Sequence, residues 1–139
     1  MDYEEYRKSF FVKPQPKQRF TFMDSFGVTL YFADYDAAVN YYEQVLGSPN
    51  YVEGEGTKGW SIGNGWLTLL RGKEGNPRNV EITFEVETPS EAEKLQREFI
   101  EAGGAGEEAS DQLMYRRIRF CPVVDPFGTN ILIISPLPG

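Results

Sequence analysis

The sequence of 139 residues, with 40% hydrophobic and 25% charged side chains, has the length and composition of one globular domain. It contains no histidine, which excludes Ser-His-Asp and Cys-His catalytic groups and every histidine-ligated metal site. The net charge of −7 disfavours nucleic acid as a partner, and no apolar run approaches the ~18 residues of a membrane-spanning helix.

Residues 1–20 are expected to form an N-terminal extension, followed by a single domain over residues 21–139. Pro14 and Pro16 would stop any helix that begins within Asp2–Phe11. The aromatic residues of this stretch are expected to pack on the body of the protein or on a partner subunit. The acidic and aromatic start, MDYEEYRKSF, is unlike a secretory signal, so we expect a cytoplasmic protein.

The first strand and helix are predicted from alternation and capping signals. Gly27–Phe32 alternates between apolar side chains and Gly, Thr or Tyr, which indicates a half-buried strand. A helix is predicted from about Asp36 to Leu46, because Asp34 or Asp36 can cap its start and Gly47 follows its end.

A β-hairpin is predicted over residues 60–70, because Asn64-Gly65 is the pair that most strongly favours a two-residue turn. This turn would place Ile62 opposite Leu67. One face of the hairpin would then carry Trp60, Ile62, Leu67 and Leu69, and the other would carry Ser61, Trp66, Thr68 and Leu70.

The same order of elements begins again after a turn-rich linker at residues 73–78. Glu81–Val86 alternates as a strand, and Thr88–Glu91 is a capping box that opens a helix ending near Ala102. Two further strands are predicted at Met114–Val124 and Asn130–Ile134. The only cysteine, Cys121, lies in this apolar region and is expected to be packed and inert.

The two halves form an internal repeat, because Val28 and Ile82 occupy equivalent strand positions 54 residues apart. Such a repeat predicts an α+β fold of two βαβββ-like modules, at about residues 25–72 and 79–136. Two similar modules can enclose a shared cleft, and clefts of this kind are where ligands usually bind.

These stretches resemble, in their order and spacing, the vicinal oxygen chelate superfamily, which includes glyoxalases, bleomycin-resistance proteins and dioxygenases. The resemblance spans about residues 25–136. It rests on Val28–Asp34, Ala38–Tyr42, Leu46-Gly47, Ile82–Val86 and Asp125–Asn130. It implies a cup-shaped mixed sheet, frequent dimerisation, and either metal-dependent chemistry or metal-free binding of a ligand.

The resemblance also indicates where a metal would bind, since metal-using members place ligands on the first and last strands of each module. Those positions fall on Gly27, Thr68, Glu81 and Leu132. Only Glu81 is a strong ligand, whereas hard cations require several oxygen donors. We therefore expect no metal and no other cofactor.

The candidate site residues are those that the alternation places on the concave face of the sheets. Arg117 and Arg119 are preferred to Arg116 on this face, because Ile118 and Phe120 look core-facing. The expected ligand-binding residues are Tyr31, Trp66, Thr68, Glu81, Glu85, Arg117, Arg119 and Leu132.

These residues have structural alternatives as well as functional roles. Glu81 is the only candidate for acid–base catalysis, but Glu81 and Glu85 could instead form ion pairs with Arg117 or Arg119. Tyr31 and Trp66 could stack on a planar ligand, plug the cleft or pack at a dimer interface. Leu132 is expected to be a wall of the pocket.

The leading functional hypothesis is a metal-free protein, similar to the bleomycin-resistance branch, that sequesters a drug-like or metabolite ligand and so confers antibiotic resistance. The acidic charge favours a cationic ligand, and a homodimer is expected. An enzyme of the same fold, a lyase, isomerase or dioxygenase, is the alternative. A regulatory or interaction module whose own side chains fill the cleft is a third possibility.

Overall fold

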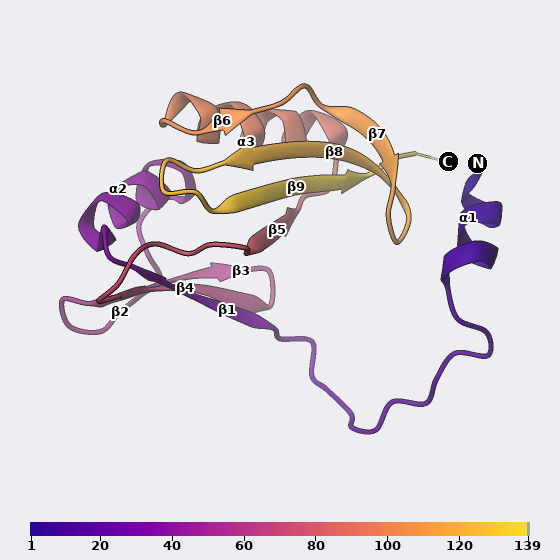
Figure 1. Cartoon of the computed structure of the whole chain (residues 1–139), viewed down its shortest axis with the longest axis horizontal. Coiled ribbons are helices and arrows are strands. Elements are labelled where there is room, and N and C mark those ends of the chain that lie inside the picture. Colours follow the sequence, from indigo (N-terminus) through magenta and orange to yellow (C-terminus); the bar gives the residue numbers. More distant parts are fainter. Residues whose placement is uncertain (139) are drawn as a thin grey trace.

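The computed structural model describes residues 1–138 and consists of two β-sheets with helices packed against them, preceded by an N-terminal segment (Figure 1). The N-terminal segment contains α1 (Tyr3–Phe10). The first module contains β1 (Gly27–Phe32), α2 (Tyr35–Leu46), β2 (Tyr51–Val52), β3 (Thr57–Ile62) and β4 (Gly65–Arg71). The second contains β5 (Glu81–Glu85), α3 (Pro89–Glu101), β6 (Ala105–Gly106), β7 (Ser110–Leu113), β8 (Arg117–Val124) and β9 (Asn130–Pro136).

The internal repeat is present in both the strands and the helices. Strands β1 and β5 begin 54 residues apart, and so do helices α2 and α3. In each module the first strand pairs in parallel with the last, giving the orders β1-β4-β3-β2 and β5-β9-β8-β6, with β7 on β8. The α+β fold of two similar modules is therefore confirmed, while the short strands β2, β6 and β7 were not predicted.

Both helices begin and end close to their predicted signals. The side chain of Thr88 accepts a hydrogen bond from the Glu91 amide at 3.2 Å, which caps α3. Helix α2 ends at Leu46 and is followed by Gly47, whose φ of +90° is accessible to glycine at little cost. Asp34 precedes α2 without capping it, because its carboxylate instead accepts a hydrogen bond from the Asn76 side chain.

One hydrophobic core joins the two modules. It contains buried side chains from both sheets and both helices, including Phe32, Tyr42, Trp60, Phe99 and Ile133. The side chains that build it alternate along each strand, so each sheet has an inner face toward the core and α2 or α3, and an opposite face that we call the open face. Placement of the site follows from this division.

A buried hydrogen-bond cluster connects the modules within that core. Asp125 is 4% exposed, and its carboxylate accepts hydrogen bonds from the Tyr42 hydroxyl at 2.8 Å and from the amides of Phe127 and Thr129. The nearby Tyr41 hydroxyl donates to the carbonyl of Phe99 at 2.8 Å. Two adjacent tyrosines of α2 thus attach the first module to the turn before β9 and to α3.

The β3–β4 turn lies one residue earlier than predicted. Gly63-Asn64 forms the turn, so Trp60 rather than Ile62 lies opposite Leu67. Gly63 has a φ of +56° at the first turn position, as in a type II′ hairpin turn. Gly65 has another role, because a Cβ there would lie 2.0 Å from the Phe26 carbonyl oxygen. The shift preserves the predicted faces, since it changes the pairing by two residues.

The N-terminal segment precedes β1 and comprises residues 1–26. Asp2 caps α1 in a reciprocal capping box with Glu5, and the helix ends before Pro14 and Pro16. The Tyr3 hydroxyl donates to the carbonyl of Tyr115, in the turn between β7 and β8, at 2.8 Å. Figure 1 shows the following stretch looping away from the two sheets before it enters β1. Within residues 1–138, no helix combines the length and the apolar character needed to cross a bilayer.

The Tyr42–Asp125 hydrogen bond is expected to contribute measurably to stability. Tyr42→Phe removes one donor from a buried carboxylate, and we expect the free energy of unfolding to fall by about 1–3 kcal/mol. Urea unfolding followed by fluorescence measures this loss. Tyr51→Phe is the matched control, because the Tyr51 hydroxyl bonds the exposed Glu53, and its unfolding midpoint should not change. Equal midpoints for both variants would contradict the assignment.

Candidate functional site: the open faces of the two sheets

The open faces of the two sheets carry very few charges. In the strands of residues 1–138, the register places only two charged side chains there, Glu81 and Glu85, and no Lys or Arg. Apart from Gln112 of β7, the other large side chains on these faces are mainly apolar or aromatic: Tyr31, Tyr51, Trp66, Leu70, Ile118, Phe120, Leu132 and Ile134. The open face of the second sheet is therefore acidic and apolar, whereas the strands of the first sheet place no charged side chain on its open face.

A cleft of about 320 Å³ lies at one end of the open face of the second sheet, around Glu81. Glu81 and Asn130 are direct neighbours across the β5–β9 pair. Glu107 also lines the cleft. The other lining residues are mainly apolar: Ala105, Gly106, Phe120, Pro122, Val123 and Val124. This Glu81 cleft combines two carboxylates and a carboxamide with an apolar floor, and no Lys or Arg lines it.

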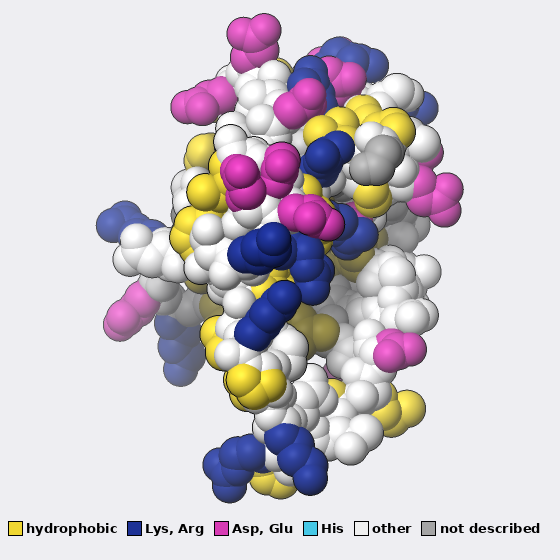
Figure 2. All heavy atoms as spheres, turned by 90° about the vertical axis from the view of Figure 1, so that its right-hand side faces the viewer, with side chains coloured by type: hydrophobic (Ala, Val, Ile, Leu, Met, Phe, Trp, Pro, Cys, Tyr) yellow, Lys and Arg dark blue, Asp and Glu magenta, His cyan; other side chains and the backbone are white. Residues whose placement is uncertain are grey.

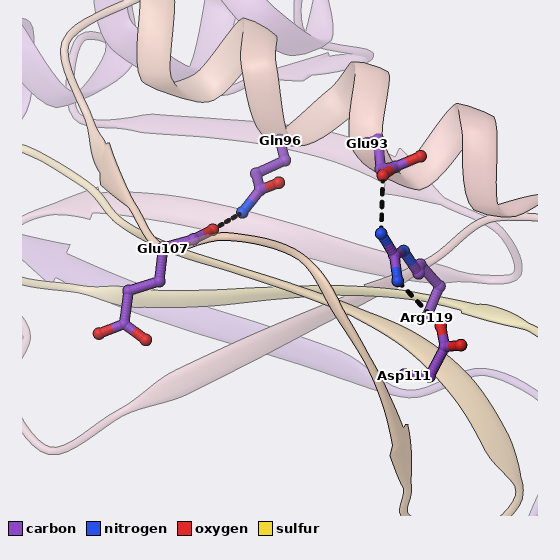
Figure 3. Close-up of polar contacts among 5 residues, drawn as sticks. All are labelled: Glu93, Gln96, Glu107, Asp111 and Arg119. Atoms are coloured by element: carbon purple, nitrogen blue, oxygen red, sulfur yellow. Dashed lines mark hydrogen bonds and ion pairs between the residues drawn. The ribbon is translucent and has the colours of Figure 1, made fainter.

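The position of Glu107 depends on α3. Gln96, which is 6% exposed, donates hydrogen bonds to the carbonyls of Glu107 at 2.8 Å and of Pro122 at 2.9 Å. Figure 3 shows the Glu107 carboxylate pointing away from Gln96 and from the helix. The buried carboxamide thus fixes the backbone at the rim of the cleft while the acidic side chain remains exposed.

A second cleft of about 270 Å³ lies between β5 and the β3–β4 turn, around Trp66. Asp24 and Phe26 of the N-terminal segment line it together with Thr83, while the rest of the lining is largely apolar. The Trp66 ring lies edge-on to Tyr51, with centroids 6.3 Å apart. Gly59 makes room for this pair, since a Cβ there would lie 3.4 Å from both side chains.

The predicted site residues do not all meet in one cavity. Glu81 lines the first cleft and Trp66 lines the second. Tyr31, Thr68 and Glu85 lie on the open faces, as the alternation predicted, but line neither cleft. The shared concavity expected between the modules is thus represented by two smaller clefts.

The placement of Arg117 and Arg119 on the concave face was wrong. The register of β8 puts both on the inner face of the second sheet, with Arg119 opposite Ser135 of β9 and Arg117 opposite Leu113 of β7. Arg119 forms ion pairs with Glu93 of α3 at 3.1 Å and with Asp111 of β7 at 2.9 Å (Figure 3). The error arose because β8 is apolar on both faces, so Ile118 and Phe120 looked core-facing.

A second, smaller hydrophobic cluster lies on the open face of the second sheet and changes the predicted role of Leu132. Leu132 is 1% exposed and packs with Ile118 and Ile134 on the open face, so it is not a pocket wall. Met114, from the turn between β7 and β8, packs against this cluster. From the same turn, Arg116 forms an ion pair with Glu85. The alternative role of Glu85, an ion pair with an arginine, is therefore present, but its partner is Arg116 and not Arg117 or Arg119.

The cleft residues Glu107, Phe120, Pro122 and Val124 were not predicted from the sequence. The available signal was the alternation of β8, because Arg119 and Cys121 share one face and Phe120 and Pro122 the other. Glu107 gave no signal, since it follows a two-residue strand that has no recognisable pattern.

The positions that correspond to metal ligands do not form a ligand set. Gly27 has no side chain, Leu132 is apolar and buried, and Thr68 offers only a neutral oxygen, so Glu81 is the single carboxylate among the four positions. Within residues 1–138, no group of three or more Cys, Asp or Glu side chains is placed to hold an ion. The donors present therefore do not fit the metal centre that the fold family often contains.

The buried titratable groups are structural. Burial, with the neighbouring Asp125 carboxylate, raises the pKa of both Tyr41 and Tyr42. Burial also raises the pKa of the Cys121 thiol, with a smaller contribution from Glu93. Cys121 is fully buried on the inner face of β8, so it faces neither cleft.

Known structures identify the fold. A glyoxalase/bleomycin resistance protein from Albidiferax ferrireducens T118 matches with a TM-score of 0.65 and 14% identity, over 80% of this chain and 97% of that chain. A glyoxalase/bleomycin resistance protein/dioxygenase family enzyme from Burkholderia phytofirmans PsJN matches with a TM-score of 0.66 and 18% identity, over 80% and 97%. A lactoylglutathione lyase from Agrobacterium tumefaciens matches with a TM-score of 0.62 and 16% identity, over 78% and 90%.

The chain therefore has the glyoxalase/bleomycin-resistance fold, as the resemblance predicted. No protein-family model matches the sequence, and a search of curated proteins likewise gives no match. About a fifth of the chain lies outside the first two matches, a share close to that of the 26 residues that precede β1.

Arg119 is expected to support the fold and not to contact a ligand. Arg119→Gln removes the ion pairs to α3 and β7, and we expect a lower midpoint in urea. Glu93→Gln, which removes one of the same pairs, should shift the midpoint in the same direction. A variant of Arg119 with unchanged stability and impaired ligand binding would contradict this assignment.

Cys121 is expected to be unreactive in the native protein. Its buried position excludes reagents, and its raised pKa keeps the thiol protonated at neutral pH. A chromogenic disulfide reagent should modify it only after unfolding in urea. Rapid modification of the folded protein would show that the thiol is accessible.

Proposed function

We propose that this protein binds a cationic small molecule in the Glu81 cleft, without a metal, and thereby sequesters it. The observation that carries the proposal is the lining of this cleft, which offers Glu81, Glu107 and the Asn130 carboxamide above an apolar floor. A cation that enters the cleft meets two carboxylates and no competing Lys or Arg among the lining side chains.

The charge pattern around the cleft supports a cationic ligand. Within residues 1–138, Glu81 forms no ion pair, whereas Glu85 is paired with Arg116. The carboxylate of Glu81 is thus available to a ligand. The free-energy cost of removing a ligand's cation from water is offset only where opposite charge and hydrogen-bonding groups replace the water. The carboxamide of Asn130, next to Glu81, supplies such a hydrogen-bonding group.

The apolar floor supports a ligand with a hydrophobic or aromatic part. Phe120, Pro122 and Val124 offer surface that a planar or aliphatic group can cover. A volume of about 320 Å³ lies at the small end of the ~300–1,000 Å³ usual for small-molecule pockets. We therefore infer an amine or guanidine attached to an apolar group. Sequestration of such drug-like molecules would place the protein nearer to the bleomycin-resistance proteins than to the metal-dependent enzymes of this fold.

Substitution of Glu81 tests the proposal. Titration calorimetry with a panel of aromatic amines, guanidines and cationic glycopeptides identifies a binder, and Glu81→Gln should weaken its binding by about tenfold or more. Glu98→Gln is the matched control, because Glu98 is an exposed residue of α3 and its loss changes the net charge equally. The control should leave the dissociation constant within about twofold.

Two outcomes would contradict the proposal. One is a ligand whose affinity falls equally in both variants, because the effect would then come from net charge alone. The other is stoichiometric metal in purified protein, measured by elemental analysis, together with turnover of a substrate. That result would favour the enzymes of the same fold.

A further inference from the structure

The open face of the second sheet continues past the Glu81 cleft toward Glu85. The register arranges the side chains of β5, β9 and β8 on this face in three rows: Glu81, Asn130 and Val124; Thr83, Leu132 and Pro122; Glu85, Ile134 and Phe120. Pro122 and Phe120, which form part of the floor of the cleft, belong to the second and third rows. The apolar floor therefore runs from the row of Glu81 to the row of Glu85.

The middle of this face is apolar and its strands place no charged side chain there. Leu132 is 1% exposed and Ile134 is 8% exposed, and both belong to the hydrophobic cluster on this face. Beside them on β5, the side chain of Thr83 is exposed. A ligand that extends from the first row to the third would lie over an apolar surface, with one hydroxyl group at its edge.

Two carboxylates mark the ends of this surface. Glu81 and Glu85 are both exposed and project from the same face of β5. Because four residues of an extended strand separate them, their Cα atoms lie about 13 Å apart. Within residues 1–138, Glu81 forms no ion pair, whereas Glu85 is paired with the guanidinium group of Arg116. The face therefore has two anionic positions, and a cation of the chain itself occupies one of them.

This cation comes from the turn between β7 and β8 and not from a strand of the face. Met114 of the turn packs against the hydrophobic cluster, and Arg116 lies against Glu85. Figure 2 shows Lys and Arg side chains beside Asp and Glu side chains across the middle of the side on which Figure 1 places this turn. The turn thus brings positive charge over the end of a face whose strands carry none.

The ion pair between Arg116 and Glu85 is of the kind that a ligand can replace. The side chains are 49% and 40% exposed, and ion pairs exposed to this degree contribute little to stability. Among the residues that the structure describes, Arg116 has no second carboxylate within ion-pair distance. Its guanidinium group can therefore move into water at little cost when another cation takes its place.

We infer that Glu85 is a second cation-binding position of the ligand site, and that Arg116 occupies it when no ligand is bound. The ligand that satisfies both positions is an elongated dication, with an amine or guanidine at each end of an aliphatic or aromatic chain. This inference rests on the proposed function, because it extends the site around Glu81 along β5 to Glu85.

A comparison of two amines of equal chain length tests the second position. Titration calorimetry gives the dissociation constants of decylamine and of diaminodecane, whose terminal ammonium groups are about as far apart as Glu81 and Glu85. The ratio of the two constants measures the preference for the dication. Glu85→Gln should lower this ratio by about threefold or more, and Arg116→Gln should raise it by about threefold, since the competing cation is gone.

Matched controls separate a local effect from an effect of net charge. Glu98→Gln and Arg97→Gln make the same charge changes at exposed positions of α3. Both should leave the preference for diaminodecane unchanged. If they shift the ratio as much as Glu85→Gln and Arg116→Gln do, the inference is wrong.

Nuclear magnetic resonance reports directly on Arg116. Its Nε–H signal in the ¹⁵N-labelled full chain is assigned by its loss in Arg116→Gln, at a mildly acidic pH where exchange with water is slow. Diaminodecane at saturation should shift this signal, because the guanidinium group leaves Glu85. Decylamine and diaminobutane should not shift it, since the first lacks the second cation and the second is too short to reach both carboxylates.

The outcomes distinguish this inference from the proposed function. If Glu81→Gln weakens both amines while Glu85→Gln leaves the ratio unchanged, or if diaminodecane does not move the Arg116 signal, only the second position is wrong. If Glu81→Gln leaves the affinity for both amines unchanged, the proposed function and the contact at two points both fail. Absence of binding by either amine, to the wild type and to Arg116→Gln, would also overturn the second position.

Discussion

Both sheets give their inner faces to one hydrophobic core, and this single constraint decides which side chains remain for function. The core requires Leu30, Phe32, Ile82, Phe84 and their neighbours to point inward, together with the helix residues that cover them. Because strand side chains alternate, the residues between them must point outward. The open faces are therefore formed by the strand side chains that the core does not use.

The alternation made the fold and much of the open faces predictable from the sequence. The repeat located both modules, since a strand followed by a capped helix occurs twice at a constant spacing. The hairpin faces were also correct although the turn was displaced, because a shift of two residues in pairing leaves parity unchanged. Prediction failed at β8, where Ile118 and Phe120 are as apolar as the inward-facing Cys121 and Val123.

Other parts of the site could not be predicted, because they depend on tertiary contacts. The pairing of Arg116 with Glu85 requires the turn between β7 and β8 to fold over the open face, and strand β7 gave no sequence signal. Likewise Gln96 is a polar residue in a helix, and nothing in the sequence shows that its carboxamide holds the backbone of Glu107 and Pro122. The predicted site residues Tyr31, Thr68 and Glu81 all lie on the open faces of the two sheets, but the sequence could not show that only Glu81 borders the Glu81 cleft.

The proposed ligand site follows from the electrostatics of the second sheet. With the strand cations on the inner faces or at the edges, the open face of this sheet attracts the positive charge of a small molecule. This attraction does not involve histidine, the side chain whose ordinary pKa lies nearest neutrality, because the sequence has none. Ionic strength rather than pH is consequently the variable that should control ligand binding near neutrality. The shape of the cleft limits the ligand further, because a cleft with Pro122 on its floor and Glu107 at its rim admits a compact group.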